Sequence, residues 1–392
     1  MRSIAIVGGT IIDGTGAPPI HSGTLTIEGG KISAVGEAAL IEVAEGAEVV
    51  DARGKTVMPG LIDTHQHVGF DFGALKRLRE CADRGTTTVA GVTSGPGGVR
   101  LRQAIEQGLV DRCPRYFVGC VVGATCGHLR RTDANEPGIT VDGPWEVRRG
   151  VREMVLAGAD FIKASASGGF QWAEERVEWE DYTYEELLAL TEEAHAKGRK
   201  VTVHAHSQPG LNHAIAAGCD NIHHGALIDG EALEGIRGRG LYYVPTLHIT
   251  SEKVIGNTSF GPWTRERMAA AHPVHREGVA KAHAMGLKLA VGTDGGPGDA
   301  AHELIELCAC GLSPMEAIVA GTRNSAESLG ILEQTGTLEA GKDADVIVVS
   351  GDPLADISVL YEKASISLVL RAGRLVAFDE QYKGHYHPRE TS

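Results

Sequence analysis

From residue 57 to residue 335 the sequence alternates between short apolar runs, typical of buried strands, and stretches with the period of amphipathic helices. The apolar runs are residues 57–64, 86–92, 116–122, 160–165, 201–206, 221–224, 241–247 and 287–292. Among the helix-like stretches, residues 184–197 place Leu187, Leu188 and Thr191 on one face and acidic residues on the other. Alternating strands and helices form parallel sheets covered by helices, and eight such units can close into a barrel. The sequence therefore predicts an α/β fold with a (β/α)8 TIM barrel over residues 57–335.

The segments on either side of the predicted barrel have β character. Short runs rich in Ile, Val and Thr occupy residues 4–7, 10–12, 24–27 and 31–35, and similar runs return at 345–349, 365–370 and 375–378. Gly8-Gly9 and Gly29-Gly30 are the expected turns. Residues 1–56 and 336–392 are therefore expected to form one small composite β-sandwich domain from both termini. No helical pattern follows the early glycines, so they do not predict a dinucleotide site.

Composition narrows the class of function. The net charge is −14 and no run of five or six basic residues occurs, which argues against a nucleic-acid or anionic membrane partner. No apolar run is long enough to span a bilayer, and the first residues lack a signal-peptide core, so we expect a cytoplasmic protein. Seven scattered cysteines fit free thiols in a reducing compartment. The expected partner is a small-molecule substrate, and the sequence leaves a homo-oligomer open.

Polar residues end five of the expected barrel strands. They are His65 and His67 on the first strand, Lys163 on the fourth, His204 and His206 on the fifth, His223 and His224 on the sixth, and Asp294 after the eighth. The C-terminal ends of barrel strands form one face, so these side chains should surround a single mouth. Since side chains alternate along a strand, His65 and His67 point the same way and can converge on one metal ion.

Lys163 is the most informative of these residues. A protonated amine about 4 Å from a dication costs roughly 4 kcal/mol per unit charge at an effective dielectric near 20. The conflict disappears if the amine carries CO2 as a carbamate, because that group is an anionic oxygen donor that can bridge two metals. The alternative for Lys163 is an ammonium group paired with an acid at the mouth. The alternative for Asp294 is a helix N-cap before Gly295.

This set of residues resembles the amidohydrolase superfamily. Its binuclear members place His-x-His after strand 1, a carboxylated Lys after strand 4, His after strands 5 and 6, and Asp after strand 8. Residues 163–169, 201–206, 222–229 and 344–349 more narrowly resemble the imidazolonepropionase-related branch. That branch includes Xaa-Pro and Xaa-Arg dipeptidases and N-acyl amino acid hydrolases. The resemblance covers nearly the whole chain, because this family also builds a small β domain from both termini.

The resemblance implies a binuclear centre of two divalent metal ions, with zinc expected from the ligand types and CO2 as the carbamate on Lys163. The implied ligands are Lys163, His204 and His224 for the more exposed ion, and His65, His67 and Asp294 for the more buried ion, with Lys163 bridging both. His204 is preferred to His206 because the ligands of strands 5 and 6 lie twenty residues apart in relatives, as His204 and His224 do. His223 stands where relatives usually have Glu. His206 stands where many have a substrate-contacting Tyr.

The implied mechanism is hydrolysis by a hydroxide that bridges the two metals. Two metals lower the pKa of a shared water toward about 7. Asp294 should take the proton of this water and pass it to the leaving nitrogen. His128, after strand 3, should hydrogen-bond the substrate carbonyl, as the histidine near this position does in relatives.

Substrate-binding candidates lie in the loops around the mouth. Arg130 or Arg131 could hold a substrate carboxylate, or both could be solvated loop charges. His248 ends the seventh strand and is expected to point at the mouth. The last candidates are Phe170, Trp172 and Trp179, which follow the fourth strand. They either line the substrate pocket or pack on one another.

The sequence thus predicts a metal-dependent, metallopeptidase-like amidohydrolase that cleaves an amide C–N bond in a dipeptide or an N-acyl amino acid. The alternative is a cyclic-amide hydrolase or heterocycle deaminase of the same superfamily. Mononuclear deaminases have an acid three residues after the strand 5 histidine, where this chain has Ser207, which argues against deamination. A non-catalytic scaffold is the third reading, and the complete ligand set argues against it.

Overall fold

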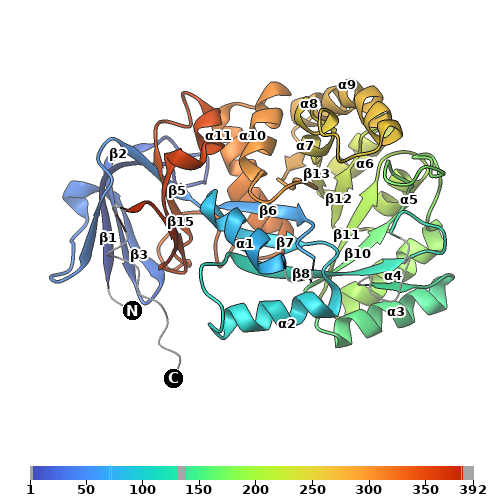
Figure 1. Cartoon of the computed structure of the whole chain (residues 1–392), viewed down its shortest axis with the longest axis horizontal. Helices are drawn as coiled ribbons and strands as arrows, with labels where there is room; N and C mark the ends of the chain where they lie inside the picture. Colours follow the sequence, from blue (N-terminus) through green and yellow to red (C-terminus); the bar gives the residue numbers. More distant parts are fainter. Residues whose placement is uncertain (1–2, 70, 72, 130–137, 381, 383–392) are drawn as a thin grey trace.

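A computed structural model describes residues 3–69, 71, 73–129, 138–380 and 382. Eight parallel strands form a curled sheet in the order β14-β13-β12-β11-β10-β8-β7-β6 (Figure 1). They are β6 Leu61–Gln66, β7 Thr86–Gly91, β8 Arg115–Gly123, β10 Phe161–Ser165, β11 Lys200–Ala205, β12 Asn221–His224, β13 Tyr242–Val244 and β14 Lys288–Leu289. A short strand, β9 Gly138–Thr140, pairs with β8 outside this order. Each of the eight predicted apolar runs overlaps one strand of the sheet.

Backbone hydrogen bonds join the two ends of this sheet. Thr64 N donates to Val291 O at 2.9 Å, and Asp294 N donates to His65 O at 2.8 Å. The segment after β14 therefore lies beside β6, and the sheet curls back on itself. The arrangement is TIM-barrel-like.

Helices cover the outside of the curled sheet. They are α1 Ala74–Asp83, α2 Gly95–Glu106, α3 Pro144–Leu156, α4 Tyr184–Ala196, α5 Gly210–Ala216, α6 Gly230–Arg239, α7 Leu247–Thr250, α8 Glu252–Ile255, α9 Pro262–Ala284, α10 Ala300–Ala309, α11 Pro314–Val319 and α12 Ser325–Leu329, with a π-helical turn η2 at Ala320–Asn324. The predicted helix at 184–197 is α4, which begins with a capping box between Thr183 and Glu186. Among the described residues no helix has the length and hydropathy of a membrane span.

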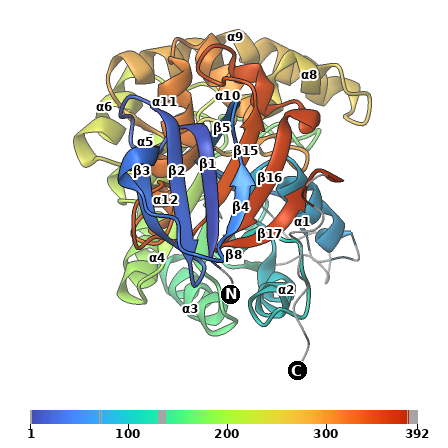
Figure 2. The same cartoon turned by 90° about the vertical axis from the view of Figure 1, so that its left-hand side faces the viewer.

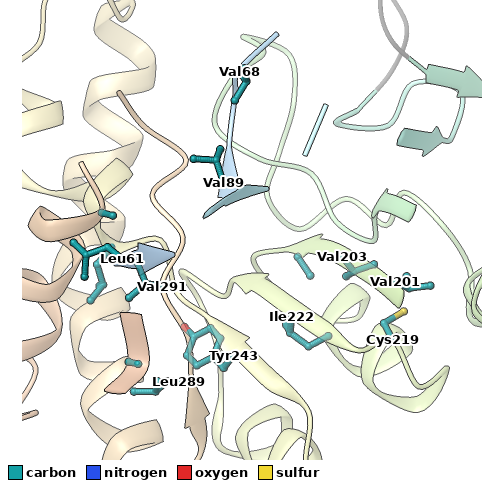
Figure 3. Packing of buried hydrophobic residues seen from close by; sticks show 14 of the residues in the cluster. Leu61, Val68, Val89, Val201, Val203, Cys219, Ile222, Tyr243, Leu289 and Val291 are labelled. Atoms are coloured by element: carbon teal, nitrogen blue, oxygen red, sulfur yellow. The ribbon is translucent and has the colours of Figure 1, made fainter. Parts of the chain in front are cut away.

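The main hydrophobic core lies between this sheet and its helices. Val201 and Val203 of β11 belong to one buried cluster with Leu187 and Leu190 of α4, and Figure 3 shows Val201 and Val203 close to Ile222 of β12. Because side chains alternate along a strand, His204 points to the opposite side from Val203. Outward packing of the apolar residues therefore directs the intervening polar residues into the barrel.

Strands from both ends of the chain form a second, eight-stranded sheet beside the barrel. Its order is β17-β16-β15-β5-β1-β2-β3, with β4 paired to β1. The strands are β1 Ile4–Ile11, β2 Ile20–Glu28, β3 Lys31–Glu37, β4 Glu48–Asp51, β5 Lys55–Pro59, β15 Val346–Ser350, β16 Ile366–Arg371 and β17 Arg374–Phe378. The short helices η1 Ala38–Leu40, η3 Ile357–Leu360 and η4 Lys363–Ser365 lie in the same terminal segments. Figure 2 looks onto this sheet. The described strands form one continuous hydrogen-bonded sheet with its own buried cluster rather than two separate sheets.

Two local predictions are wrong. Gly8-Gly9 is not a turn, because both glycines lie inside β1, where the register shifts between Val7 and Gly9 and Gly8 has a φ of +79°. The glycines therefore form a bulge that bends the strand. Residues 57–64 are not one strand, because β5 pairs with β15 in the terminal sheet whereas β6 belongs to the barrel. The chain passes from one sheet to the other at Gly60, and we propose the domain boundary there, close to the predicted one.

Gly60 has no room for a side chain, so a substitution there should destabilise the protein. A Cβ at residue 60 would lie 2.1 Å from Cγ2 and 2.2 Å from Oγ1 of Thr87 on β7. Gly60→Ala should therefore lower the free energy of unfolding by about 1–3 kcal/mol, measured by chemical denaturation. Gly230→Ala is the matched control, because a Cβ there meets no atom of the described residues within 4 Å. Equal denaturation midpoints for the two variants would contradict this packing.

Candidate active site

A cavity of about 450 Å³ opens at the C-terminal ends of the barrel strands. Its polar lining contains all six predicted metal ligands together with two further predicted site residues. These are His65, His67, Lys163, His204, His224 and Asp294, with His128 and His206. The strands β6, β10, β11 and β12, the residue directly after β6 and the segment after β14 supply the six ligands, so the fold brings together residues far apart in sequence.

Asp294 stands at the centre of one group of donors. Its Oδ1 lies 2.7 Å from Nε2 of His67 and 3.3 Å from Nε2 of His65, and its Oδ2 lies 3.9 Å from Nδ1 of His224. Burial alone would raise the pKa of Asp294, but His65 and His67 lower that pKa well below its usual value. Asp294 and His224 also have φ angles of 52° and 76°, in the left-handed region that non-glycine residues seldom adopt. The carboxylate is thus ionised and held in a strained backbone.

Lys163 is fully enclosed in the barrel. The residue is 1% exposed, and its Nζ has no hydrogen-bond partner among the described residues. Burial lowers the pKa of this amine to about 7. A substantial fraction of the amine is then neutral at neutral pH, the form that can react with CO2. Buried polar atoms without a partner are rare in folded proteins, so this amine fits a position that carries a modification or contacts a metal ion.

Each of the four predicted ligand histidines uses its second ring nitrogen in a hydrogen bond within the protein. His65 Nδ1 lies 2.6 Å from His223 Nδ1, His67 Nδ1 lies 3.0 Å from Thr93 Oγ1, His204 Nε2 lies 3.3 Å from Gly168 O, and His224 Nδ1 lies 2.8 Å from Thr246 Oγ1. Metal-binding histidines are normally oriented in this way by an outer partner. In His206, by contrast, the buried Nδ1 has no partner among the described residues.

The buried histidines are neutral. Burial lowers the pKa of His65 to about 3, and burial together with neighbouring histidines lowers the pKa values of His204 and His224 well below the usual value. Ligand atoms of His204, His206 and His224 lie within 4.8 Å of one another, as do those of His65, His224 and Asp294. Neutral imidazoles, a carboxylate and an unpaired amine fit the donor requirements of divalent metal ions.

Apolar side chains also line the cavity. They are Leu129, Phe170, Ile249, Phe260 and Met268. Phe170 follows β10, whereas Ile249, Phe260 and Met268 come from the α7–α9 segment, whose helices lie together at one end of the barrel (Figure 1). Phe170 and Met268 are buried in one cluster, against which Ile249 and Phe260 pack. We call these five residues the apolar wall. Only Phe170 was singled out from the sequence.

The structure does not place the remaining predicted substrate-binding residues at the cavity. Arg130 and Arg131 lie outside the described residues. His248 was expected to point at the mouth, but it is not among the cavity-lining residues; its Nε2 lies 3.3 Å from Asp299 Oδ2 and its ring packs against Gly295. β13 ends at Val244, and Thr246 adopts a φ of 53°, so the strand alternation used for His248 does not extend that far. His248 supports the backbone that follows Asp294.

Two acidic residues that the sequence did not single out contact His128 but do not line this cavity. Glu175 Oε1 is 2.8 Å from His128 Nδ1, and Asp181 Oδ2 accepts a hydrogen bond from His128 N at 2.8 Å. Trp172 donates from Nε1 to His128 O at 3.1 Å, and Trp179 is 40% exposed. These contacts join the loops after β8 and β10. No local pattern in the sequence could have paired residues so far apart.

The fold and the site are those of a TIM-barrel-like hydrolase. The chain belongs to the amidohydrolase family, whose family model matches residues 56–376. The predicted family is therefore confirmed, and the chain is an enzyme that hydrolyses carbon–nitrogen bonds.

Known proteins are similar to this chain over nearly its full length. An ochratoxinase of Aspergillus niger is 29% identical over 94% of this chain and 86% of its own length. An imidazolonepropionase of Symbiobacterium thermophilum is 27% identical over 92% of this chain and 91% of its own. The crystal structure of a Xaa-Pro dipeptidase with bound methionine superposes with a TM-score of 0.86 at 30% identity, covering 95% of this chain and 99% of its own. These similarities support amide-bond hydrolysis.

The enclosed amine of Lys163 should destabilise the protein when it has no modification or metal. Lys163→Met replaces it with an apolar side chain of similar length, so the metal-free variant should be more stable by about 1–3 kcal/mol. Thermal unfolding after chelation measures this. Lys200→Met is the control, because Lys200 Nζ donates to the carbonyl oxygens of Glu327 and Ser328, and its loss should be destabilising. A destabilised Lys163→Met variant would show that the amine is paired in solution.

Proposed function

We propose that the chain hydrolyses the amide bond of a dipeptide or an N-acyl amino acid at a centre of two divalent metal ions, with zinc as the expected metal. One observation carries this proposal: neutral histidines and an ionised Asp294 surround a buried Lys163 that has no hydrogen-bond partner among the described residues. His65, His67 and Asp294 would hold one ion, and His204 and His224 the other. Lys163, carrying CO2 as a carbamate, would be shared between them.

When bound, the two ions would polarise the substrate carbonyl and make a water molecule more acidic. Asp294 would accept the proton of the attacking water and deliver it to the leaving nitrogen. Its contacts with His65 and His67 support this role, because they keep the carboxylate ionised and fixed. His128 would donate a hydrogen bond to the carbonyl oxygen as negative charge develops there.

The apolar wall supports a substrate with a bulky apolar group. Burial of apolar surface contributes about 25 cal/mol per Å², so a large aliphatic or aromatic group against Phe170, Phe260 and Met268 adds to affinity. The similarity to imidazolonepropionase favours a second candidate function, hydrolysis of a cyclic amide or deamination of a heterocycle.

A substrate screen tests the proposed function. Zinc-loaded protein, prepared with bicarbonate, should release the amino acid from N-acetylphenylalanine and N-acetylleucine faster than from N-acetylaspartate. Asp294→Asn should lower kcat at least about 100-fold, because the proposed general base and a proposed metal ligand are both lost while the fold remains. Product formation is measured by chromatography, and circular dichroism checks the fold. Opening of cyclic amides without hydrolysis of any linear amide would favour the second candidate.

The metal ligands are tested by elemental analysis. His204→Asn should reduce the zinc content from about two ions per chain to about one, because His204 has the outer hydrogen bond typical of a ligand. His206→Asn is the matched control and should retain the wild-type zinc content. The opposite result would make His206 the ligand and His204 the residue next to the substrate.

A further inference from the structure

The loop between β10 and α4 holds His128 by three separate groups. Trp172 Nε1 donates to the carbonyl oxygen of His128, Asp181 accepts from its backbone N–H, and Glu175 Oε1 lies 2.8 Å from its Nδ1. We call Trp172, Glu175 and Asp181 the His128 clamp. The backbone of residue 128 is therefore held on both sides while a carboxylate holds the ring.

The ring of His128 has little freedom within this clamp. It stacks on the ring of His204 with centroids 3.9 Å apart and an interplanar angle of 12°. On another side it meets Gly169, where an added Cβ would lie 2.6 Å from both Nδ1 and Cε1 of His128. His204 and the bare backbone of Gly169 thus define the plane in which the imidazole lies.

Glu175 is built into the protein as an anion. Its side chain is only 4% exposed, and Trp172 N also donates to Oε2 at 3.3 Å. Burial opposes ionisation, but the hydrogen bond and charge of His128 leave the pKa of Glu175 below its usual value. A carboxylate at one ring nitrogen fixes the N–H on that nitrogen and the orientation of the ring. Since Nδ1 faces Glu175, Nε2 is the nitrogen left for the cavity that His128 lines.

We propose that Glu175 is a positioning residue that accepts a hydrogen bond from Nδ1 of His128 and so directs Nε2 into the cavity, toward the substrate carbonyl; this rests on the proposed amide hydrolysis. Trp172 and Asp181 fix the backbone from which the ring projects.

Glu175→Gln tests the proposal with little change in shape. The amide removes the negative charge, so kcat should fall about 10- to 100-fold with a smaller change in KM, because the hydrogen bond to the carbonyl is strongest in the transition state. Glu178→Gln is the matched control, since Glu178 lies on the same loop and is exposed. It should change kcat less than twofold.

A double-mutant cycle separates positioning from a general structural role. In a His128→Gln background, Glu175→Gln should have no further effect on kcat, because the residue through which it acts is gone. Thermal unfolding of all four proteins checks that each is folded. Losses of kcat that simply multiply in the double variant would overturn the proposal.

Nitrogen NMR of the metal-free protein, labelled with 15N-histidine, gives a readout that needs no substrate. The wild-type protein should show a protonated Nδ1 on His128, assigned as the signal that disappears in His128→Gln. This proton should be lost or shared with Nε2 in Glu175→Gln and kept in Glu178→Gln. The expected signals would support the clamp even if no amide were cleaved, in which case only the proposed function fails. A wild-type His128 without a proton on Nδ1 would overturn the clamp.

Discussion

The site depends on the seam where the first barrel strand meets the segment after the last. Asp63 of β6 lies at this seam: its Oδ1 accepts hydrogen bonds from His65 N at 3.0 Å and Thr293 N at 3.1 Å, and its Oδ2 accepts one from Thr293 Oγ1 at 2.8 Å. Burial raises the pKa of Asp63 to about 6 despite these bonds. One buried carboxyl group thus fixes the backbone on both sides of the pair formed by His65 and Asp294.

Some buried polar atoms at the mouth, such as Nζ of Lys163, lack among the described residues the partners that such atoms normally have in a protein interior. Divalent metal ions could supply those partners. Desolvation keeps the histidines neutral and depresses the pKa of Lys163, while Asp294 remains ionised because it is surrounded by ring nitrogens. Such a set of buried donors contributes little to folding without a ligand and costs free energy where atoms stay unpaired. The cost is concentrated at the cavity, whereas the surrounding strands are packed with aliphatic side chains. Function and stability are therefore served by alternate residues of the same strands.

This alternation explains what could be predicted from the sequence. The apolar side chains that face the helices recur every second residue, so the chain order of strands and the identity of His65, Lys163 and His204 as residues of one mouth follow from local periodicity. Features that depend on contacts between distant segments cannot be predicted from local periodicity. The pairing of Glu175 with His128, the apolar wall from α7–α9 and the orientation of His248 all depend on where loops fold. The break at Gly60 was missed because the residues on both sides of it are buried and apolar, although in different sheets.

The pairing of β5 with β15 also has a consequence for how the chain is made. Met58 lies opposite Ile347, so one edge of β5 has its neighbour only after the entire barrel has been synthesised. Until then a nascent chain carries an open strand edge, the kind of surface that recruits other chains. Closure of that edge requires long-range pairing, which is slow relative to helix formation. The terminal sheet is therefore the last part of the molecule that can be completed, and a chain released before β15 has been synthesised keeps the unpaired edge of β5.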